Sequence, residues 1–173
     1  MALRQPLNKP LDWLISLRHY NAMSDRDPFW KIKSLSQMTH DEWESLCDGC
    51  GKCCLIKLQD IDTGEYYFTD VGCTLLDQST CRCKDYANRK AIVPDCVILK
   101  PNTLDQIPWM PDSCSYRLLY EGKTLPAWHP LVTGDPSSTH QAEQSVAGKI
   151  ISEDHVDEQD LPSHIKDWSS HNG

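Results

Sequence analysis

Four cysteines fall within eight residues of this chain, and no other feature of the sequence restricts its fold as strongly. They stand in the run Cys47-Asp48-Gly49-Cys50-Gly51-Lys52-Cys53-Cys54. Thiolates bind zinc and iron because the metal displaces their protons and matches their polarizability. A two-residue gap lets the chain turn so that two sulfurs face one ion, and a glycine after the second cysteine permits the tight turn. The run therefore predicts a centre that binds a thiophilic metal.

The spacing of these cysteines leaves the choice between zinc and iron open. The segment from Cys47 to Lys52 has the form of a zinc knuckle. The spacing Cys47-x-x-Cys50-x-x-Cys53 also holds three corners of a 4Fe–4S cluster in bacterial ferredoxins, although the Cys-Pro that completes the ferredoxin run is absent. Cys53 and Cys54 are adjacent, so we expect their side chains to diverge. Cys54 could serve a second centre, cap a larger cluster or be a buried thiol.

Five further cysteines follow, at positions 73, 81, 83, 96 and 114, so two four-sulfur centres would leave one of the nine over. Cys81 and Cys83 are predicted to share one face of a strand, and Cys96 to follow a turn. Cys114 is predicted near the N-terminus of a helix, whose dipole favours a thiolate. Ligation and a structural role both stay open for Cys73. The predicted metal ligands are Cys47, Cys50, Cys53, Cys54, Cys81, Cys83, Cys96 and Cys114.

Histidine is the other residue type that could complete such a centre. His129 stands in the stiff segment Leu125-Pro126-Ala127-Trp128-His129-Pro130-Leu131, where it is either a packed side chain with satisfied nitrogens or a ligand. No Ser/His/Asp signature, phosphate-binding glycine loop or pair of carboxylates stands out. If the chain is an enzyme, its candidate groups are His129, Tyr116 and Arg117.

The cysteines could instead form disulfides, but the sequence favours a reducing compartment. Their number is odd, and the apolar stretch 11–17 is too short for a secretory signal and contains Asp12. No run approaches the roughly 18 apolar residues of a membrane span. The net charge of −8 argues against a nucleic-acid partner, which would require a basic surface. We therefore expect a cytoplasmic protein whose partner is a metal ion or cluster, with neither a membrane nor a nucleic acid bound.

The expected fold class is α+β, a small irregular metal-organised domain with short helices and a β-hairpin. With 2 Phe and 11 Pro the apolar core is poor, a situation in which metals often add stability. Helices are predicted over 28–33, with Asp27 as N-cap, from a Thr39–Glu42 capping box to Leu46, and over 113–121 between Asp112 and Gly122. Strands are predicted at 55–58 and 65–69 around a turn at 62–64, and residues 73–111 are predicted to be irregular.

Three parts of the chain are expected to differ in character. Residues 1–22 are interpreted as an N-terminal extension, because Met23 is a possible start of translation directly before a helix signal. Residues 23–151 are predicted to form the cysteine-cluster domain. Residues 152–173 are acidic and polar, and we expect this tail to be frayed.

The cysteine run and several later motifs resemble a known bacterial family. Cys47-x2-Cys50-x2-Cys53-Cys54 is the signature of the CxxCxxCC family of zinc- or iron-chelating domains, and the likeness is greatest to its YcgN-type cysteine cluster proteins. The resemblance covers roughly residues 27–151. Its other motifs are Asp27-Pro28-Phe29-Trp30, Trp43-Glu44-Ser45-Leu46, Tyr67-Phe68-Thr69, Thr80-Cys81-Arg82-Cys83, Tyr86, Arg89, Pro94-Asp95-Cys96, Cys114-Ser115-Tyr116-Arg117-Leu118-Leu119, Glu121-Gly122-Lys123 and residues 125–131.

The resemblance implies a metal-binding protein and leaves its task open. Similar modules occur in flagellin lysine methylases, which moves the expectation towards iron, in the form of an iron–sulfur cluster, ahead of zinc. The chain shows no recognisable pattern for binding S-adenosylmethionine. The alternatives are a zinc-dependent adaptor, an iron–sulfur enzyme or redox accessory protein acting on a protein or small molecule, and a metal-storage or trafficking protein.

Overall fold

The computed structural model describes residues 27–168 and shows a small α+β domain, as the sequence predicts. The extension 1–22 and the start at Met23 lie outside the described residues. Within 27–168 no helix is long and apolar enough to cross a bilayer. The α-helices are α2 (Phe29–Ile32), α3 (His40–Ser45), α4 (Arg89–Ile92), α5 (Ser115–Tyr120), α6 (Pro130–Thr133) and α7 (Ser138–Gln141); the 3-10 helices are η1 (Leu35–Gln37), η2 (Lys52–Cys54), η3 (Leu104–Gln106), η4 (Glu153–His155) and η5 (Glu158–His164).

Of the helix starts predicted from local sequence signals, that of α3 is confirmed and that of α2 is shifted by one residue. The capping box before α3 is confirmed, because the Glu42 N–H donates to Thr39 Oγ1 at 3.2 Å and the Thr39 N–H donates to Glu42 Oε2 at 2.8 Å. The predicted Asp27 cap of α2 is wrong by one residue, since Pro28 is the N-cap.

The start of α5 also differs from the prediction, since this helix begins at Ser115 with Cys114 as its N-cap. The Asp112 carboxylate instead pairs with the Arg117 guanidinium at 2.6 Å. Gly122 follows the helix with a φ of +71°, as expected for a residue that ends it.

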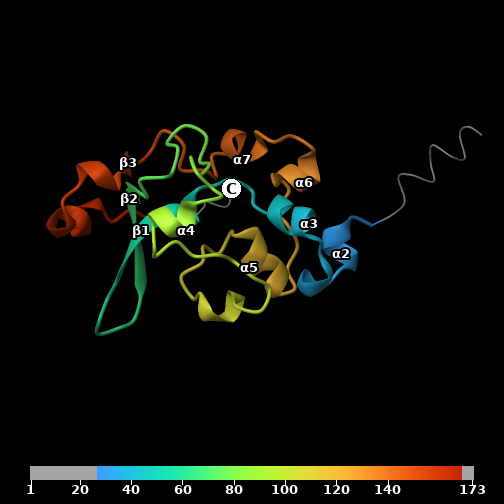
Figure 1. The fold of residues 1–173 in the computed structure, drawn as a ribbon. Helices are drawn as coiled ribbons and strands as arrows, with labels where there is room; N and C mark the ends of the chain where they lie inside the picture. The colour runs from blue at the N-terminus through green and yellow to red at the C-terminus, as the bar shows by residue number, and fades with distance from the viewer. Residues whose placement is uncertain (1–26, 169–173) are drawn as a thin grey trace, which may run out of the picture.

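A three-stranded sheet joins the predicted hairpin to the C-terminal segment. Strands β1 (Leu55–Gln59) and β2 (Tyr66–Gly72) are antiparallel, which confirms the hairpin, and β3 (Ile151–Ser152) pairs in parallel with β2. The Trp168 indole N–H donates to the Thr69 carbonyl at 2.9 Å. The expectation of a frayed tail is therefore wrong for residues 152–168, which pack along β2 (Figure 1).

Two small apolar cores stand on either side of the cysteine run. The first contains Trp43, Leu46, Leu104, Ile107, Met110 and Tyr116. The second contains Leu55, Leu76, Cys81 and Val146. Leu46 directly precedes Cys47 and Leu55 directly follows Cys54, so the run is anchored in one core at each end. Figure 1 shows the same division, with α2 and α3 at one end of the molecule and the hairpin with the C-terminal segment at the other.

The segment 73–111 is largely irregular, as predicted, apart from α4 and η3. The prediction that Cys81 and Cys83 share a strand face is wrong. Cys81 has a left-handed backbone with a φ of +54°, and Cys83 takes part only in an isolated bridge with Leu76. Asp77 Oδ1 accepts the N–H groups of Ser79 and Thr80 at 3.0 and 2.8 Å, which closes a turn before these cysteines.

Candidate metal centre

The run from Cys47 to Cys54 makes two sharp turns. Gly49 and Gly51 both have left-handed backbones, with φ of +73° and +77°, a conformation that glycine adopts without steric cost. Asp48 Oδ1 accepts the Cys50 N–H at 3.0 Å and fixes the first turn. The prediction that Gly51 permits a tight turn after the second cysteine is confirmed.

The turns direct backbone N–H groups at the sulfurs. The Gly49 N–H acts on the Cys47 sulfur and the Lys52 N–H on the Cys50 sulfur, and both interactions favour the thiolate. In the metal-free protein, effects that raise the pKa values of both thiols outweigh these interactions. Desolvation by the surrounding protein atoms raises the pKa of Cys47 to about 12, although the residue reaches the surface, and the nearby Cys53 and Asp48 add to the rise. Burial also raises the pKa of Cys50. A bound cation would reverse both effects, because it stabilises several thiolates at once.

Cys53 and Cys54 lie closer together than expected. Their Sγ atoms are 3.8 Å apart, so the expectation that the two side chains diverge is wrong. The hydrogen bond from Cys54, aided by the charge of Lys57, lowers the pKa of Cys53 to about 7 despite its dense surroundings, and it raises the pKa of Cys54. Cys53 is therefore the thiol of the run that ionises first, and its residue retains contact with solvent.

Lys57 supplies a fixed positive charge next to this pair. Its ammonium group donates to the Cys53 carbonyl at 2.8 Å and to the Leu55 carbonyl at 2.6 Å, and it lies 4.2 Å from the centre of the Trp109 ring. The charges of Cys53, Cys54 and Cys73 act on it and oppose the desolvation that lowers its pKa. A cation held here compensates the negative charge that thiolates bring to a metal centre.

Cys114 approaches the run from α5. The Tyr116 hydroxyl donates to the Trp43 carbonyl at 3.0 Å and thereby holds α5 against α3. Cys114 makes no capping hydrogen bond of full geometry, but the Arg117 and Tyr116 N–H groups face its sulfur. Burial raises the pKa of Cys114 to about 12, and the charge of Cys53 adds to the rise. Cys114 thus lies near Cys53 and Asp48 of the run.

The other cysteines lie on the sheet side of the run. The Cys73 N–H donates to the Cys54 carbonyl at 2.9 Å, and Cys83 bridges to Leu76 in the turn that follows Cys73. Burial raises the pKa of Cys73, and the charges of Cys96 and Cys83 are among the further causes, which places these thiols near one another. Cys54 borders the same group, because the charge of Cys73 acts on it.

Cys81 packs in the second core and also borders the run, because its Sγ lies 3.2 Å from the position of a Cβ added at Gly51. It is 6% exposed and packs in the second core with Leu55, Leu76 and Val146. Burial raises its pKa, opposed by the Val146 N–H, and the charges that act on it are led by Asp77. Arg82 and Asp48, which also act on Cys47, are among those charges, so Cys81 is a buried thiol beside the run.

All nine cysteines lie in the described part of the chain, and none forms a disulfide. Within residues 27–168 no three Cys, His, Asp or Glu side chains are already spaced as the ligands of a single ion. The structure therefore gathers the predicted ligands into neighbourhoods without closing a coordination sphere. The donor chemistry nevertheless fits a thiophilic metal, because several thiols converge beside two fixed cations, Lys57 and Arg82.

His129 occupies the packed alternative of the two that the sequence leaves open. It is fully buried, its Nε2 lies 3.1 Å from the Leu46 carbonyl oxygen, and its Nδ1 accepts the Leu131 N–H at 3.0 Å. With both nitrogens engaged, the neutral imidazole joins α6 to the residue that precedes Cys47.

The other candidate enzyme groups are engaged in similar structural contacts, Tyr116 with Trp43 and Arg117 with Asp112 and Glu121.

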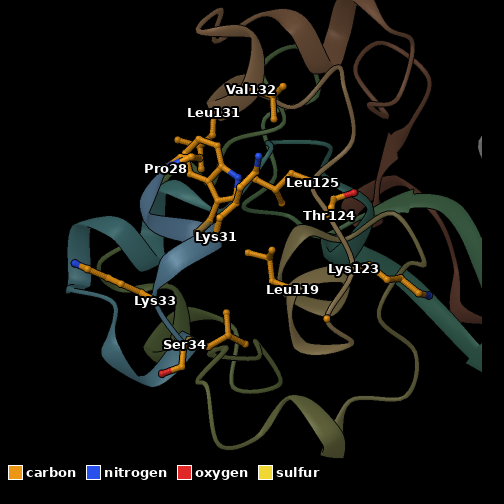
Figure 2. A pocket seen from close by; sticks show the side chains of 13 residues that line it. Pro28, Lys31, Lys33, Ser34, Leu119, Lys123, Thr124, Leu125, Leu131 and Val132 are labelled. Carbon is orange, nitrogen blue, oxygen red and sulfur yellow. The ribbon is translucent and has the colours of Figure 1, made fainter. Parts of the chain in front are cut away.

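A pocket of about 730 Å³ opens away from the cysteines, between α2, the end of α5 and α6 (Figure 2). Its lining includes Trp30, Leu119 and Leu131 and contains no cysteine.

Sequence reasoning missed three charged residues around the run. Asp48 is 5% exposed and its Oδ2 lacks a hydrogen-bond partner, although its place between two cysteines could have drawn attention. The Arg82 guanidinium lies over Gly49, where an added Cβ would meet its Cζ at 3.2 Å. Lys57 sits in a strand whose pattern gives no sign of a metal role.

Gly51→Ala is expected to destabilise the protein by about 2–5 kcal/mol, the sum of left-handed backbone strain and overpacking. An added Cβ would lie 2.8 Å from Val146 Cγ2 and 3.2 Å from Cys81 Sγ. Urea denaturation measures the change. Gly64→Ala is the matched control, since Gly64 has a φ of +76° and nothing within 4 Å of the added atom, so only about 1–2 kcal/mol is expected there. Equal losses in the two variants would show that Gly51 is not closely packed.

Comparison with known proteins places this arrangement in a family. Residues 46–115 match the model of the CxxCxxCC family, described as "Putative zinc- or iron-chelating domain". A UPF0260 protein of Parvibaculum lavamentivorans is 58% identical over 142 residues, which cover 82% of this chain and 93% of the relative. A UPF0260 protein of Caulobacter sp. (strain K31) is 60% identical over 131 residues, covering 76% and 81%. One from Brucella canis is 54% identical over 145 residues, covering 83% and 95%. No solved structure matches the chain.

Proposed function

Because this chain belongs to the UPF0260 family and carries the CxxCxxCC domain, we propose that it is a cytoplasmic metal-binding protein whose cysteine cluster holds iron, as an iron–sulfur cluster, in preference to zinc. The observation that supports the proposal is the approach of Cys114 to Cys53, which in turn lies near Cys47 and Cys50 in the turns of the run. Four thiolates are the full ligand set of a tetrahedral ion or of a 4Fe–4S cluster. The remaining predicted ligands, Cys54, Cys81, Cys83 and Cys96, stay predictions at this point.

The preference for iron rests on the spacing of the run. Cys47, Cys50 and Cys53 repeat the pattern that wraps three corners of a four-iron cluster, and Cys114 supplies the distant fourth ligand such clusters require. An iron–sulfur cluster can take up and release an electron, whereas zinc cannot. The chain's own residues would hold the cluster, exclude water on the α5 side through Tyr116 and Trp43, and balance its charge through Lys57 and Arg82.

Zinc is the alternative, and one sulfur–sulfur distance is compatible with it. Two sulfurs on a tetrahedral zinc at about 2.3 Å are separated by about 3.8 Å. Cys53 and Cys54 have this separation, although their S–H···S hydrogen bond accounts for it equally well. A single zinc bound by both residues would make the protein an adaptor whose folding depends on the ion.

The cytoplasmic part of the proposal is supported by the cysteines themselves. Nine is an odd number, and none of them is paired in the structure. Free thiols at this density persist in a reducing compartment and would be oxidised outside it.

A visible absorption spectrum of the full-length chain, purified under strictly anaerobic conditions and combined with elemental analysis, tests the metal. We expect a brown protein that contains iron and acid-labile sulfide, with absorption that bleaches on reduction. A colourless protein holding stoichiometric zinc under the same conditions would reject the iron–sulfur proposal and leave zinc binding in place. Both metals are supplied at equal concentration during purification, so that the metal found does not merely reflect the metal that was available.

A further inference from the structure

We propose that Thr139 is a positioning residue of the cysteine run, the middle one of three buried residues that hold the backbone of the run in place. The other two are His129 and Val146, and we call the three together the carbonyl clamp. The inference rests on the proposed metal-binding function and adds to the site a segment, 129–146, that contains no cysteine. This segment lies outside residues 46–115, which match the chelating-domain model.

The carbonyl clamp binds alternate carbonyl groups of the backbone that leads into the run. The contacts are His129 Nε2 with the Leu46 carbonyl oxygen at 3.1 Å, the Thr139 hydroxyl with the Asp48 carbonyl at 2.8 Å and the Val146 N–H with the Cys50 carbonyl at 2.9 Å. The three acceptors are two residues apart, so the backbone is held on both sides of Cys47 and again at Cys50. In Figure 1, α6 and α7 lie beside the segment between α3 and β1 that contains the run.

The interior position of these contacts makes each donor necessary. All three residues of the carbonyl clamp are fully buried, and the residues that supply the acceptors are buried as well. Water has no direct access to such carbonyls, so a carbonyl that lost its donor would be left unpaired. The backbone would then have to shift to find another partner.

Local hydrogen bonds hold Thr139 where it can make its contact. It lies in α7, and its carbonyl accepts the Gln144 N–H at 3.0 Å. The His140 ring and the Ser145 hydroxyl are hydrogen-bonded at 2.6 Å, which closes the loop between α7 and Val146. Thr139 and Val146 are therefore joined into one packed unit that faces the run.

The hydrogen bond from Thr139 fixes the peptide between Asp48 and Gly49. A trans peptide is planar, so the Asp48 carbonyl and the Gly49 N–H point in opposite directions. With the carbonyl turned towards Thr139, the N–H is turned away from it, to the Cys47 sulfur on which it acts. Thr139 thereby sets the direction of a group that favours the Cys47 thiolate.

Asp48 carries the same restraint on to Cys50. Its Oδ1 accepts the Cys50 N–H at 3.0 Å, across the left-handed turn at Gly49. A shift of the Asp48 backbone would therefore change the separation of the Cys47 and Cys50 sulfurs. A metal centre tolerates little change of this kind, because its bonds to sulfur have set lengths and angles. Thr139 thus contributes to metal affinity without touching the metal, as residues that orient metal ligands do.

Cobalt(II) binding to the reduced, full-length chain tests this role, because cobalt held by thiolates absorbs visible light and reports on the geometry of its ligands. Thr139→Val removes the hydroxyl and keeps a branched side chain. In competition with a chelator we expect it to bind cobalt roughly 10–100-fold more weakly than the wild type, with a changed absorption spectrum. Thr139→Ser keeps the hydroxyl and should restore both the affinity and the spectrum.

Thr69→Val is the matched control. Thr69 is also a fully buried threonine, and its hydroxyl donates to the Ile56 carbonyl at 2.8 Å, in the sheet and not in the run. Urea denaturation of the metal-free chains should show a loss of stability in both valine variants. Cobalt affinity and spectrum should change only in Thr139→Val, since a loss of stability alone leaves the affinity of a chain that stays folded unchanged.

The possible failures of this experiment have different meanings. A wild-type chain that holds no metal after anaerobic purification and takes up no cobalt would overturn the proposed function itself. Wild-type affinity and spectrum in Thr139→Val, or equal weakening in Thr69→Val, would overturn only the role of Thr139. Equal weakening in folded Thr139→Ser would do the same, because its hydroxyl remains. If circular dichroism shows that Thr139→Val does not fold, Thr139→Ala takes its place and decides by the same criteria.

Discussion

Cys50→Ser is expected to abolish metal binding at the cysteine run and to lower the free energy of unfolding by roughly 3 kcal/mol or more. Cys50 is 7% exposed, and the Lys52 N–H already favours its thiolate. A serine hydroxyl stays protonated at neutral pH and is a poor ligand for a soft metal. Because the metal binds only the folded chain, its loss also removes the stabilisation that binding provides.

Metal analysis and urea denaturation of the same samples measure both effects. Val71→Thr is the control, since it also places a hydroxyl at a buried position, 0% exposed, outside the cysteines. The control is expected to lose about 1–3 kcal/mol through burial of a polar group while keeping its metal. Cys50→Ser protein with wild-type metal content would show that Cys50 is not a ligand.

His129→Ala is expected to cost about 3–5 kcal/mol of stability, because it opens a cavity and leaves buried backbone groups without partners. The imidazole is fully buried and bonds the Leu46 carbonyl at 3.1 Å and the Leu131 N–H at 3.0 Å. Urea denaturation at pH 7.5 measures the loss. A change below about 1 kcal/mol would show that these contacts contribute little.

The same histidine gives the stability a pH dependence of known sign. Desolvation lowers the pKa of His129 from its usual value of 6.5, so the folded protein holds it neutral while the unfolded chain binds a proton first. Its contribution is complete above pH 6.5 and is lost as the pH falls through the folded value. Stability should therefore drop more between pH 7.5 and 5.5 in the wild type than in His129→Gln. Equal drops in the two proteins, at equal metal content, would contradict this assignment.

Features that depend on neighbouring residues could be predicted from the sequence. The capping box of Thr39 and Glu42, the hairpin and the left-handed turn at Gly51 all follow from patterns a few residues long. The cysteine run itself belongs to this class, because two-residue gaps and glycines dictate its turns. Local chemistry therefore predicted the turns of the cysteine run.

Features that depend on distant contacts could not be predicted. The tail joins the sheet through a strand of only two residues, and the Thr74 N–H reaches Glu153 Oε1 at 2.6 Å across 79 positions. Neither contact leaves a periodic pattern in the sequence. The grouping of Cys73 with Cys83 likewise depends on the isolated bridge at Leu76, and the left-handed backbone of Cys81 contradicts ordinary preferences for that residue type.

The metal-to-protein ratio of the anaerobically purified, full-length wild type tests the central claim most directly. The account predicts at least one centre per chain, which is one ion if the centre is mononuclear or about four iron atoms if it is a 4Fe–4S cluster. A folded chain that contains no bound metal after such a purification would contradict it.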